Sequence, residues 1–310
     1  MTKTLIELAR MTDDEARAYL ESLIWPNGPV CPHCGSVETF RLNGESHRAG
    51  LLKCKACREQ FTVTVGSIME DSHIPLTKWV LGFHFLCSSK KGMSSLQLQR
   101  ELELGSYRTA LFMTHRIREA MNDTLSEALK GTVEADETYV GGKPRKGDGK
   151  VHKRGRGTSK TPVAVVVERD GQSETKVLAR VDGTSLKGFI RANVDPAAAI
   201  ITDELSSYHG IGKHFDGGHQ TVNHGSDEYV RYTPTGNAIH TNTAESYFSL
   251  LKRGHYGVYH HMSKQHLHRY CDEFSFRWDH RKVSDSQRTE DALCGAAGKR
   301  LTYKQMIGKV

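Results

Sequence analysis

Three acidic residues stand where strand and helix patterns would bring their carboxylates together. Asp136 ends a strand-like run that begins at Thr132, Asp203 ends the strand-like run AAIITD, and Glu245 lies in the helix-like run NTAESYFSLLKR. Grouped carboxylates repel one another unless a hard cation binds them, and Mg2+ takes oxygen ligands. Two such ions can activate a hydroxyl and stabilise the leaving oxygen of a phosphodiester displacement. The pattern therefore predicts a magnesium site for phosphoryl transfer.

The acids that flank Asp136 have other interpretations. Successive strand residues point to opposite faces of a sheet. Glu134 is therefore expected on the same face as Asp136, and Glu137 on the other. An isolated acid at a strand end more often serves a turn or a helix cap. Three acids on suitable elements, with a lysine two helical turns after the third, favour the catalytic interpretation.

A polar stripe follows Glu245 along its predicted helix. Asn242, Glu245, Ser249 and Lys252 recur at helical spacing, with apolar residues on the opposite side. Lys252 could hold a DNA phosphate beside the metal site, and its basic neighbour Arg253 is predicted to contact DNA as well. Asn242 could cap the helix or contact metal or DNA. This helix is therefore predicted to face the substrate.

Four cysteines are spaced as zinc ligands. Cys31-x2-Cys34 and Cys54-x2-Cys57 are two tight pairs, and each pair can place two thiolates on one tetrahedral ion. The surrounding segment has too few apolar residues for a core of its own, so bound zinc is expected to stabilise it. Four unligated or redox-active thiols are the alternative. The spacing predicts a structural zinc ribbon.

A helical segment follows the cysteine pairs. Residues 94–121 have the pattern helix, glycine turn, helix, and the second helix carries Arg108 and Arg116. This pattern matches a helix-turn-helix whose second helix enters the major groove of DNA. The alternative is a helical linker with a solvated basic face. Arg108 and Arg116 are predicted as DNA contacts.

The elements from Thr132 onward alternate between strands and helices, which predicts a layered α/β domain. Strands are expected at 132–137, 161–168, 174–182, 199–203 and 220–223, and helices at 184–193, 242–252 and 263–280. The helix before this domain is expected to reach Lys130. The predicted domains are an N-terminal helix and zinc ribbon at 1–70, a helix-turn-helix-like segment at 71–130, a catalytic domain at 131–282 with a basic loop at 143–160, and a C-terminal tail at 283–310.

The bulk composition favours a polyanionic partner. The formal net charge is +7 and the pI is about 9.0, which suits nucleic acid. No apolar run approaches the roughly 20 residues that span a bilayer, so no membrane partner is expected. The N-terminus lacks an apolar signal core. These features predict a cytoplasmic, nucleoid-associated protein.

Three motifs carry a resemblance to a known family. VEADETYVGGK, IITDELSSY and HTNTAESYFSLLKRGHYGVYHHMSKQHLHRYCDEFSFRWDHR, together with the cysteine pairs, resemble bacterial insertion-sequence transposases of the DDE superfamily, in the group related to eukaryotic Merlin elements. The resemblance implies a ribonuclease H-like catalytic domain. It implies Asp136, Asp203 and Glu245 as the Mg2+-binding triad, with Mn2+ as a substitute ion and Lys252 as the associated basic residue. Many relatives carry asparagine at the position of Glu245, which leaves the third ligand open. Asn242 belongs to the same motif and is the alternative third ligand.

The resemblance also implies partners and a reaction. Such enzymes cleave double-stranded DNA at terminal inverted repeats and join the freed 3′-OH to target DNA. Because two ends are processed together, a homodimer or a larger synaptic assembly is expected. One alternative is a catalytically inactive or domesticated DNA-binding regulator that uses the zinc ribbon and the helix-turn-helix. Another is a metal-dependent nuclease that cuts without joining.

Overall fold

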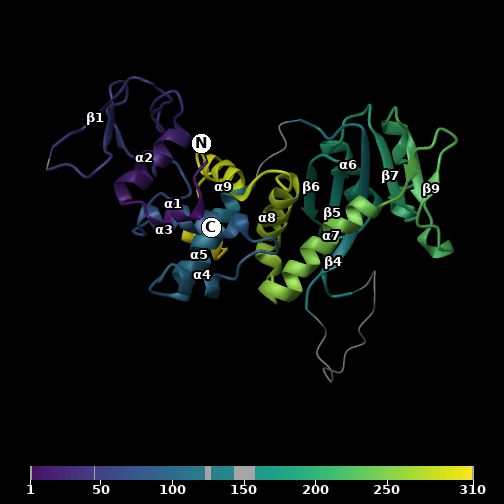
Figure 1. Cartoon of the computed structure of the whole chain (residues 1–310). Helices are drawn as coiled ribbons and strands as arrows, with labels where there is room; N and C mark the ends of the chain where they lie inside the picture. The colour runs from purple at the N-terminus through teal and green to yellow at the C-terminus, as the bar shows by residue number, and fades with distance from the viewer. Residues whose placement is uncertain (1, 45, 123–126, 143–157, 309–310) are drawn as a thin grey trace. The chain divides into compact units, whose positions relative to one another are not determined.

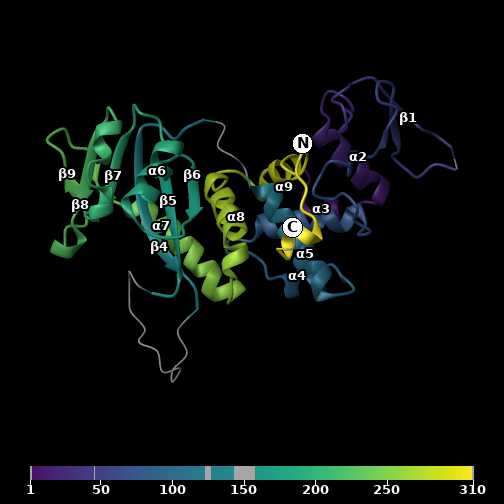
Figure 2. The same cartoon turned by 180° about the vertical axis from the view of Figure 1, so that it is seen from behind.

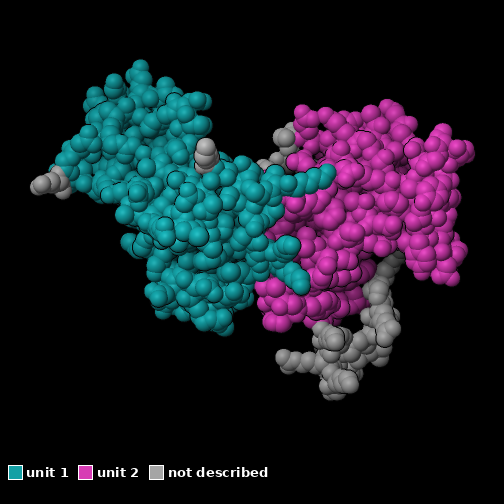
Figure 3. Space-filling model, in the orientation of Figure 1, with its two compact units in different colours: residues 1–123, 282–310 teal, residues 124–281 magenta. Residues whose placement is uncertain are grey.

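A computed structural model gives the structure of the chain and describes residues 2–44, 46–122, 127–142 and 158–308. The chain divides into two compact units (Figure 3). The first comprises residues 1–123 and 282–310, and the second comprises residues 124–281. Most of the predicted basic loop 143–160 lies outside the described residues. None of the described helices is both long and apolar enough to cross a membrane.

The first unit begins with two short helices and a small sheet. Each helix starts with a capping box, in which a threonine and a glutamate three residues later satisfy each other's backbone N–H groups: Thr4 with Glu7, and Thr12 with Glu15. The sequence predicts one N-terminal helix, whereas the structure has two. The elements are α1 (Leu5–Ala9), α2 (Asp13–Ile24), β1 (Thr39–Arg41), β2 (Leu52–Cys54) and β3 (Gln60–Phe61).

The helical part of the first unit is completed by the C-terminal segment. Helix α9 packs against α3, α2 and α5 (Figures 1 and 2). Its buried Ala292 and Leu293 explain this packing. Helix α9, which lies in the segment predicted as a tail at 283–310, is therefore part of the first unit's helical core. The elements are α3 (Leu76–Ser88), α4 (Ser95–Glu101), α5 (Tyr107–Met121), α9 (Asp285–Cys294) and α10 (Tyr303–Met306).

The second unit is built on a five-stranded mixed sheet in the order β6-β5-β4-β7-β8. The first three strands along the chain form an antiparallel meander, and β7 and β8 then add parallel to β4. The sheet strands are β4 (Thr132–Val140), β5 (Thr161–Glu168), β6 (Ser173–Val177), β7 (Ala199–Asp203) and β8 (His219–Val222). A separate two-stranded ribbon, β9 (Arg231–Tyr232) and β10 (Ala238–Ile239), precedes α7.

Helices cover both faces of this sheet (Figures 1 and 2). Helix α6 (Gly183–Asn193) packs on one face with Val133 and Ala135. Helices α7 (Asn242–Gly254) and α8 (Leu267–Asp279) pack on the other, where β5 contributes three valines. A strand buried on both faces reads as a continuous apolar run, which explains the sequence TPVAVVVE. Short helical turns are η1 (Ser206–Tyr208), η2 (Ile211–His214), η3 (His224–Ser226), η4 (His255–Tyr259) and η5 (Lys264–His266).

The structure confirms the α/β, ribonuclease H-like fold with a preceding zinc ribbon and paired helices. Three predicted boundaries are wrong. Strand β4 continues to Val140 rather than ending at residue 137, so Asp136 lies inside the strand. Helix α5 ends at Met121 rather than near Lys130, and Leu129 instead forms a β-bridge with Val194. Strand β6 ends at Val177 rather than residue 182, because Asp182 caps α6 by accepting a hydrogen bond from the Ser185 N–H.

Candidate functional site

Asp136 and Asp203 lie side by side on neighbouring parallel strands. Glu134 of β4 is the register partner of Ile201 of β7, and each aspartate stands two residues further along its strand. A step of two residues returns to the same face, so both aspartates share a face with Glu134. Asp136 pairs with Val165 of β5, whose side chain belongs to the core under α7 and α8. Both aspartates therefore face the α7 side of the sheet.

Glu245 approaches this pair from the first turn of α7. Ala244, Phe248 and Leu251 are buried against the sheet, whereas Glu245 and Lys252 are exposed. This is the amphipathic division that the sequence predicts. Glu245 Oε1 lies 3.5 Å from His224 Nε2, a neighbour that sequence reasoning missed. His224 also lies 3.1 Å from the Thr241 hydroxyl, so it fills the space between the β8–β9 connection and α7.

The three carboxylates influence one another electrostatically. Burial raises the pKa of Asp136 to about 7, and the charge of Glu137 adds to this rise. The charges of Asp203 and Glu245 raise this pKa further, whereas the Glu137 N–H, which donates to Asp136 Oδ1 at 2.7 Å, lowers it. The fold thus places the three predicted acids near enough on the α7 side of the sheet for their charges to interact, but among the described residues only the four cysteines bring their ligand atoms close enough together to hold a metal ion. The metal ligation and catalytic roles of the three acids stay predictions.

Glu134 is fully buried and connects β4 to α7. Its carboxylate accepts hydrogen bonds from the N–H groups of Thr243 and Ala244 at 2.7 and 3.1 Å, and from the Thr243 hydroxyl at 2.9 Å. Arg169 Nε donates to it at 2.7 Å, and His240 Nδ1 lies 3.1 Å away. The sequence placed Glu134 on the correct face, but it gave no sign of these contacts.

The basic residues predicted on α7 are exposed. Lys252 and Arg253 line a hollow of about 500 Å3 together with Ser246 and Ser249. Asn242 is the first residue of α7, and Thr241 occupies the N-cap position. The capping interpretation of Asn242 is therefore wrong, and contact with metal or DNA stays a prediction.

The two arginines predicted as DNA contacts on α5 differ. Arg108 is exposed, and its guanidinium stacks on the Tyr303 ring at 4.5 Å. Arg116 is buried, and its guanidinium donates to the carbonyl oxygens of Leu301 and Glu70 at 3.2 and 2.7 Å. Because Arg116 binds backbone groups inside the first unit, it presents no charge to DNA. The sequence assignment of Arg116 is corrected to a structural role.

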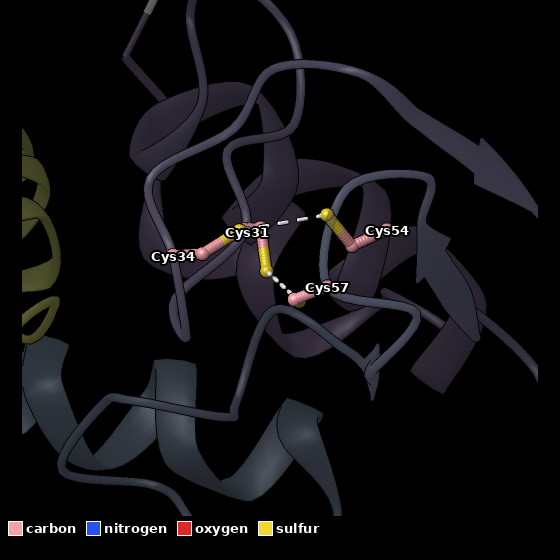
Figure 4. A group of neighbouring side chains, drawn as sticks. All are labelled: Cys31, Cys34, Cys54 and Cys57. Carbon is pink, nitrogen blue, oxygen red and sulfur yellow. Dashed lines mark hydrogen bonds between the residues drawn. The ribbon is translucent and has the colours of Figure 1, made fainter.

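The four cysteines converge on one point (Figure 4). Cys31 and Cys57 place their sulfurs 3.6 Å apart, as do Cys34 and Cys54, and all four sulfurs lie within 4.8 Å of one another. In a tetrahedral site with Zn–S distances of about 2.3 Å, neighbouring sulfurs are about 3.8 Å apart. The arrangement therefore fits a four-sulfur zinc site. Among the residues that the structure describes, no other group of side chains forms a metal cluster of this kind.

The cysteine cluster also supplies much of the local core. Its buried neighbours are few, with Leu52 and Phe61 in the centre and Trp25 against Phe61 at 5.8 Å. The N–H of Cys57 lowers the pKa of the Cys54 thiol to about 6, whereas the pKa of the Cys57 thiol is raised to about 12, so without an ion the cluster favours a thiolate at Cys54 and a thiol at Cys57.

The family model described as "ISXO2-like transposase domain" matches residues 128–279, and the one described as "Transposase zinc-ribbon domain" matches residues 11–60. A Halobacterium salinarum protein described as an uncharacterized protein in transposable element ISH50 is 29% identical over 282 residues, which cover 86% of this chain and 91% of that protein.

Two solved structures are also similar. The Mos1 strand transfer complex matches with 12% identity and a TM-score of 0.29, over 68% of this chain and 75% of that chain. A pre-cleavage Mos1 transpososome matches with 12% identity and a TM-score of 0.25, over 97% and 100%. The two family models together span more than half of the sequence and confirm the zinc ribbon. Residues 128–279 therefore belong to the ISXO2-like transposase domain family and residues 11–60 to the transposase zinc-ribbon family, and these matches support a DDE-type insertion-sequence transposase.

Proposed function

We propose that this protein cleaves double-stranded DNA at the terminal inverted repeats of its element and joins the freed 3′-OH to target DNA. The observation that carries the proposal is the placement of Asp136 and Asp203 at matching positions of two parallel strands, with Glu245 brought to them by α7. A regulator without catalysis has no need for this arrangement. Membership of a transposase family supports the same conclusion.

Asp136, Asp203 and Glu245 would hold Mg2+, with Mn2+ as a substitute. The donor set fits chemically, because carboxylate oxygens are the ligands that Mg2+ prefers. When bound, the ions supply an activated hydroxyl or water and stabilise the leaving oxygen. The sheet and α7 contribute the fixed positions of the three carboxylates.

The exposed basic residues would hold the DNA backbone. Lys252 and Arg253 lie along α7 beyond Glu245, where a phosphate can approach their hollow, and Asn242 lies at the start of the same helix. Arg108 would contact DNA from the exposed N-terminal turn of α5. The zinc ribbon and the paired helices α4 and α5 would recognise element ends. Such a protein acts where it meets chromosomal DNA, in the cytoplasm.

Two ends must be processed together, so we propose a homodimer or a larger synaptic assembly. The runner-up function is an inactive or domesticated DNA-binding regulator, which the exposed Arg108 and the zinc ribbon would also suit. The two functions differ in whether the acidic residues are needed for turnover.

The decisive experiment is Asp136→Asn in a cleavage assay with a DNA duplex that contains the element end and Mg2+. Cleavage and joining should fall below detection, while binding of the same duplex stays largely unchanged. Asp216→Asn, a substitution at an exposed aspartate on the same unit, is the matched control and should cleave normally. Equal turnover by Asp136→Asn and the unsubstituted protein would eliminate the enzyme proposal in favour of the regulator.

A further inference from the structure

Helix α7 does not cap its own N-terminus. The first N–H groups of a helix have no partner inside the helix, and a side chain just before it usually accepts them. At the N-cap of α7, the Thr241 side chain makes no such hydrogen bond. The N–H groups of Thr243 and Ala244 instead donate to Glu134 on β4, which lies 109 residues earlier in the chain. The cap of α7 is therefore supplied by the sheet.

The buried charge of Glu134 is balanced on several sides. Arg169, just beyond β5, donates from Nε to the Glu134 carboxylate at 2.7 Å. Its other two nitrogens donate to the carbonyl oxygens of Ala238 and His240, the residues that lead into α7. The positive end of the helix dipole adds favourable charge at the same carboxylate. Glu134 and Arg169 together bind both the segment before α7 and its first turn.

These contacts join the elements that carry the three candidate ligands. Glu134 stands two residues before Asp136 on the same face of β4, and its register partner Ile201 stands two residues before Asp203. On the helix, Glu245 immediately follows Ala244, whose N–H binds Glu134. A change in the length or charge of residue 134 would therefore shift Glu245 relative to both aspartates.

We propose that Glu134 is a positioning residue, an N-cap provided by β4 that sets the distance of Glu245 from Asp136 and Asp203. This inference rests on the proposed function, because it assigns Glu134 to the metal site. Glu134 itself is enclosed by α7, Arg169 and His240. Substitution of residues that orient metal ligands typically weakens metal binding about 10- to 100-fold.

The test is Glu134→Gln in the full-length, zinc-loaded protein, with Mn2+ binding measured directly by electron paramagnetic resonance. Glutamine keeps the size of the side chain but turns an NH2 group toward the surrounding donors, so the first turn of α7 loses part of its cap. Mn2+ affinity should fall at least about tenfold at a temperature where circular dichroism shows the variant to be folded. The matched control is Glu168→Gln, at the end of β5 and outside these contacts, which should bind Mn2+ normally.

A purely structural role would lower the melting temperature and leave the Mn2+ affinity of the folded protein unchanged, and that result would overturn the inference. If Glu134→Gln does not fold, Mn2+ binding is measured on Thr243→Val instead, because this variant removes only the hydroxyl contact with Glu134. It should weaken Mn2+ binding roughly two- to tenfold, and unchanged affinity would count against the inference. Mn2+ binding by Asp136→Asn is measured in parallel. Normal Mn2+ binding by Asp136→Asn would refute the metal site itself. If only Asp136→Asn loses Mn2+ affinity and the Glu134 variant does not, the metal site stands and only the role of Glu134 is refuted.

Discussion

The zinc ribbon and the proposed acidic site would each bind a cation, but the protein builds them in opposite ways. The zinc ligands come from two tight turns, and the sulfurs already lie within 4.8 Å of one another in a region with few other core residues. The acidic residues come from β4, β7 and α7, which are held by two hydrophobic cores on the two faces of the sheet. In the zinc ribbon the bound ion would stabilise a segment that has little hydrophobic core. In the second unit the hydrophobic cores fix the positions of the candidate ligands.

The two regions therefore differ in whether their folding depends on a metal ion. Zinc binding in such modules is folding free energy, because the site does not exist in the unfolded chain. The sheet of the second unit buries enough valine, leucine and aromatic side chains to fold without an ion. Metal should therefore control structure in the ribbon and only chemistry at the acidic site.

The largest expected effect is the loss of zinc. Cys54→Ser should remove on the order of 10 kcal/mol of stabilisation from the ribbon, because Cys54 is buried in the centre of the cluster. Hydrogen exchange followed by mass spectrometry should show fast exchange across β1, β2 and β3, with β4 and β5 still protected. Cys294→Ser, at an exposed thiol outside the cluster, is the control. Equal protection of the ribbon in both variants would contradict the claim that zinc stabilises this region.

The two regions should also respond to pH in opposite directions. Thiolates must stay deprotonated to bind zinc, so the ribbon is destabilised as the pH falls. In the second unit, burial raises the pKa of Asp279 to about 7, above its unfolded value of about 3.9. The folded state therefore binds more protons between these values, and stability is lost as the pH rises through about 7.

Asp279→Asn tests this second response. Asp279 accepts hydrogen bonds from the N–H and hydroxyl of Ser173 and so connects α8 to β6. The variant should reduce the loss of protection in β6 and α8 between about pH 4 and about pH 7, as measured by hydrogen exchange corrected for intrinsic rates. Some pH dependence should persist, because burial also raises the pKa of the neighbouring Glu174 to about 7. An unchanged pH profile in Asp279→Asn would show that Asp279 does not carry the effect.

The features that are local in the sequence were predictable. The Cys-x2-Cys pairs fix the zinc ligands because each pair is a single turn. The run TPVAVVVE indicates a strand buried on both faces. Asp136 and Asp203 come together because they occupy matching register positions on two adjacent parallel strands, although Asp136 lies within β4 and not at its end. The amphipathic pattern of α7 places Glu245 and Lys252 on its exposed side. In each case a short-range pattern determines what the side chain can reach.

The features that depend on distant packing were not predictable. The contacts of Glu134 join residues 109 positions apart, and no local pattern indicates that α7 lacks a cap of its own. The basic pattern of α5 does not reveal that Arg116 is covered by Leu301 and the segment near Glu70. Likewise, α9 has the sequence of an ordinary amphipathic helix, and only the complementary surface of α3 determines where it packs.

The smallest expected effect compares the exposed face of α7 with the opposite face of the sheet. If Lys252 binds one DNA phosphate, Lys252→Ala should reduce the slope of log K against log salt concentration by about 0.9. Lys187→Ala is the matched control, because Lys187 lies on α6, which packs on the other face. Binding is measured by fluorescence anisotropy with an element-end duplex at several salt concentrations. A reduced slope only in Lys252→Ala would place the DNA backbone along α7, on the side where Asp136, Asp203 and Glu245 converge; equal slopes in both variants would place it elsewhere.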